Sequence, residues 1–258
     1  ANAFPQANKL GLSATPERGD GKGLGTKCGC FFDVMVNGPT TRWLVENGYL
    51  TPPKVFIPER VSEKAIIAGD VIKHWRQYAD NTPTVAFCVS VKHAEDMAAE
   101  FNAHGIPAAS VDGAMDKYQR RDTIKALADG RIKVLTSCEV ISEGVDIPAI
   151  GCAILLRRTT SVAMYLQQVG RALKPCKGKD YAVILDHVGN TLLHGLVTDQ
   201  WTWSLMGKKE RKRAIASEEI KVIQCNTCYH AYRPSTSRKC PMCGTTPQVK
   251  ARKLAYNT

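Results

Sequence analysis

The chain has 258 residues, and its 35 Lys and Arg against 24 Asp and Glu give a formal net charge of +11. That length accommodates one α/β domain and a small accessory module. The charge favours a polyanionic partner such as nucleic acid, although a basic surface also serves simply to keep a protein soluble and monomeric. No apolar run approaches the ~18–20 residues that span a bilayer, and residues 1–27 lack a signal-peptide pattern, so we expect an intracellular protein without a membrane partner.

The first 57 residues predict short elements around a linker. Residues 9–16 (KLGLSATP) predict a buried strand that ends at Pro16, because proline cannot continue a central strand. Residues 17–30 are rich in glycine and charge and predict a linker. Residues 40–48 predict a helix, and the prolines that follow force an extended segment through residues 55–57. A start so close to a strand indicates a further domain upstream.

Helices and strands alternate from residue 62 onward. The predicted helices span residues 62–78, 93–104, 118–128 and 161–173, and the predicted strands span residues 84–89, 108–111, 132–136, 152–156 and 181–185. Continuous apolar strands between helices predict an α/β fold, with a parallel sheet covered by helices on both faces. In such sheets, ligands are expected at the carboxyl ends of the strands.

The alternation stops after Gly195. The run KKERKR at residues 208–213 predicts a helical connector, whose basic face either is solvated or binds nucleic acid. Two Cys-x-x-Cys pairs follow, separated by eleven residues; their members are Cys225, Cys228, Cys240 and Cys243.

The paired cysteines predict a zinc ribbon. Four thiolates at this spacing suit tetrahedral Zn²⁺, and a module of about 25 residues has too little core to fold without a metal. His230 is an alternative to one thiolate. Aromatic and cationic residues are interleaved in the module, which is typical of nucleic-acid surfaces, although a purely structural ribbon is the alternative. These residues are Tyr229, Tyr232, Arg233, Arg238 and Lys239.

Four segments resemble motifs of superfamily 2 helicases. Residues 136–146 (TSCEVISEGVD) resemble motif V, and residues 167–174 (QQVGRALK) resemble motif VI. Residues 13–15 (SAT) resemble motif III, and residues 87–91 (FCVSV) resemble motif IV. The likeness covers most of the chain and implies the C-terminal half of a DEAD/DEAH-type helicase, with a RecA-like fold. With its terminal ribbon, the layout is similar to RadD-type and phage DNA helicases.

The resemblance implies roles for individual residues. Gln167 and Arg171 share a helix face that can address the γ-phosphate of ATP, with Arg171 as an arginine finger. Lys174 stands where the family usually has a second arginine. The remaining nucleotide contacts fall to Gly144, Asp146 and Gly170. The nucleic-acid contacts fall to Ser13, Thr15, Ser90, Val91, Arg120 and Thr136.

The sequence contains no pattern that can cradle the phosphates of ATP or hold its Mg²⁺. Residues 19–23 (GDGKG) fail the phosphate-loop pattern, because Pro16 stands at its first glycine and Gly23 replaces the Mg²⁺-binding hydroxyl. ATP with Mg²⁺ is therefore expected only together with an upstream RecA-like domain, in the same chain or in a separate one.

The sequence thus predicts part of an ATP-dependent helicase that acts on DNA, with RNA left open. We expect it in the cytoplasm of a bacterial or phage-infected cell, associated with the nucleoid. The rival prediction is a non-enzymatic nucleic-acid-binding adaptor. The expected divisions are the tail of the first RecA-like domain with a linker, the second RecA-like domain, a basic connector, and the ribbon with its tail, at residues 1–30, 31–206, 207–221 and 222–258.

Overall fold

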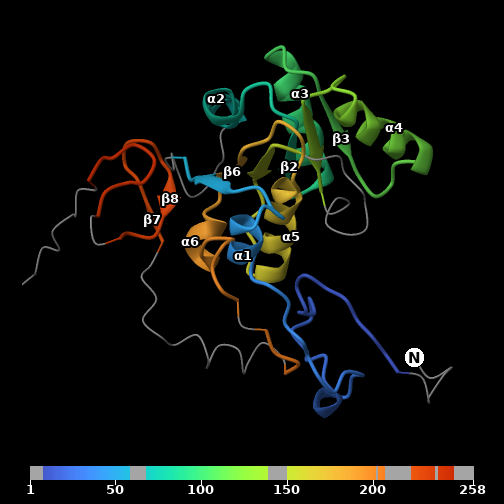
Figure 1. Ribbon diagram of the computed structural model, residues 1–258. Coiled ribbons are helices and arrows are strands. Elements are labelled where there is room, and N and C mark those ends of the chain that lie inside the picture. Colours follow the sequence, from blue (N-terminus) through green and yellow to red (C-terminus); the bar gives the residue numbers. More distant parts are fainter. Residues whose placement is uncertain are drawn as a thin grey trace, which may run out of the picture.

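A six-stranded parallel sheet forms the centre of the molecule (Figure 1). The computed structural model describes residues 8–58, 68–138, 150–201, 203–206, 222–235 and 238–246. The strand order is β1-β6-β5-β2-β4-β3, and all neighbouring strands run parallel. The strands are β1 (Pro53–Phe56), β2 (Thr84–Phe87), β3 (Ala108–Val111), β4 (Val134–Ser137), β5 (Cys152–Leu155) and β6 (Ala182–Asp186). This sheet confirms the predicted α/β fold.

Helices cover both faces of the sheet. They are α1 (Thr41–Glu46), α2 (Ala68–Ala79), α3 (Val91–Ala103), α4 (Lys117–Ala128), α5 (Val162–Leu173) and α6 (Asn190–His194), with a short 3-10 turn at Thr26–Cys28. In β2, Ala86 packs with α2 and α3 on one face, whereas Val85 and Phe87 pack with α4 and α5 on the other. Because both faces are buried, the strands are apolar throughout rather than alternating.

The predicted helix starts are fixed by capping side chains. Ser161 precedes α5, and its hydroxyl accepts a hydrogen bond from the Met164 amide. Asp116 accepts from the first amides of α4 in the same way. Such caps pair amides that a helix cannot satisfy itself. Apart from the segment at residues 9–16, the predicted elements within the described residues agree with the observed ones within two or three residues. Part of the predicted helix 62–78 and the predicted connector helix at residues 208–213 lie outside the described residues.

The predicted strand at residues 9–16 is wrong. Residues 8–13 form no strand, and Leu10 and Leu12 are 85% and 89% exposed. A strand needs a neighbour to pair its backbone groups, and the six-stranded sheet does not include this segment. The apolar residues that suggested burial lie instead on the surface of the described chain.

Leu205, which follows the last strand of the sheet in sequence, hydrogen-bonds to the predicted linker. The carbonyl oxygen of Leu205 accepts from the amides of Leu24 and Gly25, at 2.8 and 3.0 Å. A Cβ atom at Gly23 would lie 2.5 Å from the same oxygen, so only glycine fits there. Residues 203–206 therefore hold the linker close to the domain that it precedes.

A buried polar network joins the ends of β5 and β6. The Asp186 carboxylate is fully buried and accepts from the backbone amides of Asn190 and Thr191, at 3.1 and 2.6 Å. The Asn190 side chain in turn accepts from the Thr159 amide and donates to the Arg157 carbonyl, at 3.0 and 2.9 Å. The loop between β5 and α5 is thereby fixed where α5 begins, with its buried polar groups paired.

The first prediction concerns the stability of the fold in acid. Burial, and then the neighbouring His74 ring at 5.4 Å between centroids, lower the pKa of His187 to about 3. Between pH about 6.5 and 3 the unfolded chain binds a proton at His187 that the folded chain does not, so this residue makes the free energy of unfolding fall as pH falls.

Replacing the ring tests this linkage. His187→Asn should make the free energy of unfolding depend less steeply on pH in that window, by the amount that corresponds to up to about one bound proton. Denaturant titration at several pH values measures this slope. Equal slopes for His187→Asn and the unmodified chain would contradict the assignment.

Candidate functional sites on helix α5, at the sheet edges and in the ribbon

Helix α5 carries the predicted motif VI residues on its outer face. Its opposite face buries Tyr165 and Val169 in the core. Gln167 and Arg171 are half-buried and Gly170 is exposed, so the three lie on the side away from the sheet. The sequence thus correctly places Gln167, Gly170 and Arg171 together.

The direction of α5 corrects the expected location of this site. The helix starts after the carboxyl end of β5 and runs back across the sheet. Near its end, the Leu173 carbonyl accepts from the Thr51 amide at 2.9 Å, and Thr51 lies just before the start of β1. Arg171 therefore lies toward the amino edge of the sheet, not at the carboxyl ends where ligands were expected.

The motif III segment contacts this helix directly. The Gln167 amide nitrogen donates to the Thr15 hydroxyl at 3.0 Å, across 152 residues of sequence. Thr15 is 6% exposed, and its own amide donates to the Ser13 hydroxyl at 3.1 Å. The structure thus brings motifs III and VI together, with the Thr15 hydroxyl accepting a bond from the helix rather than standing open on the surface.

Gly170 leaves open space on the outer face of α5. A Cβ atom there would meet nothing within 4 Å, so the described packing does not require glycine. A mid-helix glycine costs ~1 kcal/mol relative to alanine, which suggests that the position serves something outside this packing. Lys174 is the exposed C-cap residue of the helix. Gly144 and Asp146, the other predicted nucleotide contacts, lie outside the described residues.

Ser90 and Val91 lie at the carboxyl edge, where helix α3 begins. The Ser90 hydroxyl accepts from the His93 amide at 3.1 Å, and Val91 is 42% exposed. The amino end of a helix offers unpaired amides and a partial positive charge, which suit a phosphate. Ser90 and Val91 are therefore on the surface, whereas Phe87 and Cys88 of the same predicted motif IV segment are buried.

Thr136 and Arg120 are not placed as predicted. Thr136 is fully buried, and its hydroxyl donates to the Ala94 carbonyl of α3 at 2.7 Å, so it cannot reach a nucleic-acid strand from this position. Both faces of β4 are covered, so its side chain lies in the core. The Arg120 guanidinium donates to the carbonyls of Gly113 and Met115 at 3.1 and 2.8 Å, and so fixes the preceding loop.

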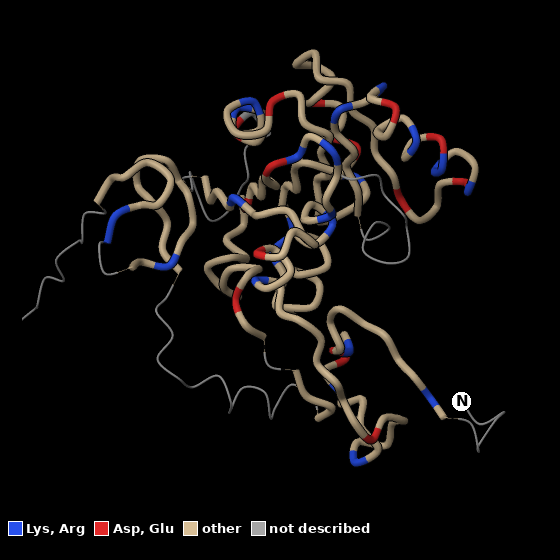
Figure 2. The backbone as a smooth tube through the Cα atoms, in the orientation of Figure 1, with Lys and Arg blue, Asp and Glu red and all other residues tan. Residues whose placement is uncertain are grey.

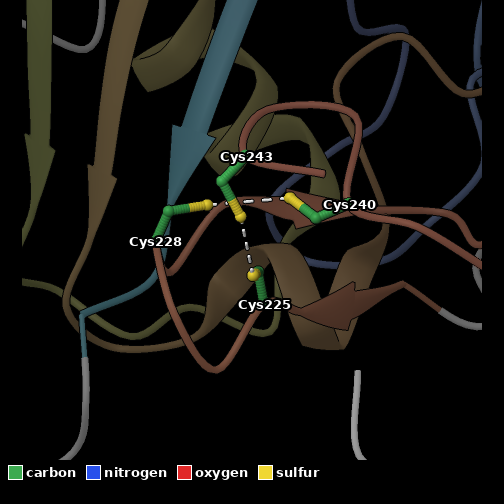
Figure 3. A group of neighbouring side chains, drawn as sticks. All are labelled: Cys225, Cys228, Cys240 and Cys243. Carbon is green, nitrogen blue, oxygen red and sulfur yellow. Dashed lines mark hydrogen bonds between the residues drawn. The ribbon is translucent and has the colours of Figure 1, made fainter. Parts of the chain in front are cut away.

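The four ribbon cysteines converge on one point (Figure 3). The Sγ atoms of Cys225 and Cys243 are 3.6 Å apart, as are those of Cys228 and Cys240, and all four lie within 4.8 Å. These separations are too long for disulfides, whose S–S bonds are about 2.05 Å. Tetrahedral Zn²⁺ with bonds of about 2.3 Å places its sulfur ligands about 3.8 Å apart, so the cluster fits a metal ion.

The two cysteine pairs share one backbone geometry. The Thr227 amide donates to Cys225 Sγ, and the Met242 amide donates to Cys240 Sγ, both at 3.4 Å. The residue after each pair has a left-handed backbone conformation, with φ of 58° at Tyr229 and 73° at Gly244. This repeat turns both sulfurs of a pair toward the same point. Burial raises the pKa values of the Cys228 and Cys240 thiols, whereas hydrogen bonds with Thr245 lower that of Cys243 to about 6.

The ribbon packs against edge strand β1. Its hairpin consists of β7 (Ile223–Gln224) and β8 (Ala231–Tyr232), and Ala231 is buried in the core of the main domain. The Ile57 amide donates to the Tyr229 carbonyl at 2.9 Å. The Arg233 guanidinium makes two bonds to the Asp199 carboxylate, at 3.0 and 2.5 Å.

This docking removes Tyr232 and Arg233 from the predicted nucleic-acid surface of the ribbon. Tyr232 is 4% exposed, and Arg233 joins the ribbon to the domain. Only Arg238 and Lys239 remain as exposed cations among the residues that were proposed. The contacts of Ile57 and Asp199 with the ribbon were not anticipated, because nothing in their local sequence marks them as an interface.

The fold and the motifs define the class of this protein. Residues 64–175 match the family of the helicase conserved C-terminal domain. Residues 64–175 therefore carry a helicase C-terminal domain, which agrees with the predicted resemblance to superfamily 2 helicases and with the parallel sheet. None of the described helices has the length and apolar character needed to cross a membrane.

Individual relatives agree with this class. The chain is 31% identical over 260 residues to a 51.5 kDa protein of Lactococcus phage (isolate 7-9), covering 93% of this chain and 56% of that protein. It is also 31% identical over 204 residues to the Schizosaccharomyces pombe protein named as mitochondrial ATP-dependent helicase irc3, covering 70% and 33%. The chain thus spans about half or less of the length of these relatives.

A solved structure shares the fold. A fragment of an HsdR subunit of a type I restriction enzyme from Vibrio vulnificus YJ016 aligns with a TM-score of 0.60 at 20% identity. The alignment covers 75% of this chain and 43% of that one. At this identity the likeness concerns the fold alone.

The buried hydroxyl of Thr136 yields the second prediction. Thr136→Val removes the bond to the Ala94 carbonyl while keeping the side-chain shape, and should lower the free energy of unfolding by about 1 kcal/mol. Thr136→Ser keeps the hydroxyl and serves as the control for the bond. Chemical denaturation measures the difference. Unchanged stability together with weakened nucleic-acid binding would instead support the original surface role.

The cysteine cluster yields the third prediction. The purified chain should contain one Zn²⁺, measured by elemental analysis, and Cys228→Ser should lose most of it. Cys176→Ser is the control, because Cys176 is an exposed thiol outside the cluster. Metal retention should weaken as pH falls, since protons compete for the thiolates. A metal-free chain with an intact ribbon would contradict the assignment.

Proposed function

We propose that this chain is the C-terminal half of an ATP-dependent superfamily 2 DNA helicase or translocase. It would supply the Gln167, Gly170 and Arg171 face of α5 to an ATP site between two RecA-like domains. The other domain would provide the phosphate-binding loop and the Mg²⁺ ligands, either before residue 1 or as a separate chain. The bond between Gln167 and Thr15 is the observation that carries this proposal, because it joins the nucleotide-facing helix to the segment that would lead in from the first domain.

Arg171 would act as the arginine finger. Phosphoryl transfer spreads negative charge over the equatorial oxygens of the transferred group, and a guanidinium that approaches across a domain interface stabilises this charge by a rate factor of ~10³–10⁵. Lys174 would add a point charge at the helix end without the planar fork of arginine. Gly170 has no side chain, and so it would let the nucleotide approach the helix. Gly144 and Asp146 stay predicted contacts from the neighbouring motif V.

The nucleic-acid strand would bind at the opposite edge of the sheet. Ser90 and Val91 present the amino end of α3 there. The described part of the ribbon contains Lys and Arg but no acidic residue, whereas α4 mixes both signs (Figure 2). We therefore assign phosphate contacts to the start of α3 and to Arg238 and Lys239 of a zinc-bound ribbon. The phage origin of one relative suits a bacterial or phage-infected cell as the setting, and DNA as the substrate and nucleoid association are parts of the proposal.

The fourth prediction tests the shared ATP site. ATP turnover should be absent for this chain alone and should appear, stimulated by DNA, when an upstream RecA-like domain is fused or added. In the active form, Arg171→Ala should reduce turnover at least ~10³-fold while sparing ATP binding. Gly170→Ala should stabilise the isolated chain by up to ~1 kcal/mol yet reduce turnover.

The opposite results are equally informative. Full turnover by Arg171→Ala would remove this residue from the mechanism. Salt-sensitive DNA binding without turnover in any combination would favour the adaptor, and a preference for RNA in the same titrations would overturn the choice of DNA. Gly19→Ala, in the open linker, is the control for adding a methyl group where no packing is disturbed.

A further inference from the structure

Lys179 makes an unusual set of contacts just beyond helix α5. Its ammonium group donates to three backbone carbonyls: those of Ile150 at 2.7 Å, Ala172 at 2.5 Å and Lys174 at 2.8 Å. A lysine ammonium has three N–H donors, so every one has an acceptor. The turn before it is fixed by Gly178, with φ of 80°, and by a bond from the Lys179 amide to the Cys176 carbonyl.

The three carbonyls belong to two different elements. Those of Ala172 and Lys174 lie at the carboxyl end of α5, where a helix leaves its last carbonyls unpaired and carries a partial negative charge. The Ile150 carbonyl lies just before β5 and directly follows residues 139–149, which carry Gly144 and Asp146. Lys179 therefore joins the end of the motif VI helix to the backbone that leaves motif V.

Removing this lysine would loosen the helical turn that carries Arg171. Arg171 lies in the last turn of α5, one residue before the bound carbonyl of Ala172. Lys179 is about half-buried, and burial lowers its pKa. The three carbonyl oxygens accept the hydrogen bonds that water would otherwise accept from the ammonium group. Without the ammonium, the three carbonyls lose a shared donor, and the last helical turn loses its attachment to the start of β5.

We propose that Lys179 is a positioning residue for ATP turnover, which holds the Arg171 turn of α5 against the Ile150 backbone just before β5. The proposal rests on the proposed function for its effect on turnover, but the attachment itself can be tested on this chain alone. A lysine that only capped the helix would contribute stability and would not act through Arg171.

Three variants separate these roles. Lys179→Met removes the ammonium but keeps a side chain of similar length. Lys179→Arg keeps the charge and N–H donors in a different geometry, and should give an intermediate result. Lys177→Met is the matched control, because Lys177 is an exposed lysine in the same turn with the same charge to lose.

The first measurement is amide hydrogen exchange in this chain. Exchange at residues 171–174 should accelerate at least ~10-fold in Lys179→Met and stay unchanged in Lys177→Met, while the amides of β2 and β5 keep their protection. Unchanged exchange at the helix end would overturn the attachment. This arm remains decisive even if no combination of domains hydrolyses ATP, a result that would reject the proposed function and not the attachment.

The second measurement is steady-state turnover in the two-domain protein. Lys179→Met should reduce kcat for ATP by about 10- to 100-fold with KM changed less than ~3-fold, since a displacement of ~1 Å can have that effect. In an Arg171→Ala background the same change should cause little further loss. Equal fold-losses in both backgrounds would overturn positioning through Arg171. If Lys179→Met does not fold, Lys179→Arg decides: a lower kcat at unchanged KM supports the proposal, and unchanged kcat overturns it.

Discussion

The packing of α5 on the sheet is the constraint on which the candidate ATP-facing surface depends. Tyr165 and Val169 are buried against the core, so the helix cannot rotate without exposing large apolar side chains. That burial fixes the outward direction of Gln167 and Arg171. The network around Asp186 and Asn190 holds the start of the helix, and the backbone of Thr51 meets its end. The apolar half of the helix thus determines where its polar half is presented.

The sheet separates the two surfaces that the proposed function requires. The start of α3 lies at the carboxyl edge and the end of α5 lies toward the amino edge, so a nucleotide and a strand would contact opposite edges of one rigid layer. Thr136 lies inside this layer and bonds α3 to β4, so it holds the start of α3 against the sheet rather than touching a nucleic-acid strand. Coupling between the edges would then be carried by movement of the whole domain.

The sequence predicts the fold well because its signals are local. Apolar strands, capping residues such as Ser161 and Asp116, and cysteine spacing each depend on a few neighbouring residues. The motif VI face follows from helical periodicity alone. The misplaced residues depend on distant contacts. Thr136 is buried because elements far away in sequence cover both faces of β4, and the burial of Leu10 depends on a neighbour far away in sequence or outside the chain. The charge of Arg233 predicts a nucleic-acid contact, but this residue instead binds Asp199, which lies 34 residues earlier.

The docked ribbon has a consequence for self-association. Strand β1 is at the edge of the sheet, where unpaired backbone groups can serve as a template for a strand of another molecule. The ribbon lies over the end of this edge through the pairing of Ile57 with Tyr229 and the bridge between Phe56 and His230. If the four cysteines hold a metal ion as proposed, that ion would also protect the edge of the sheet, and loss of the metal would expose β1 to pairing with a strand of another molecule.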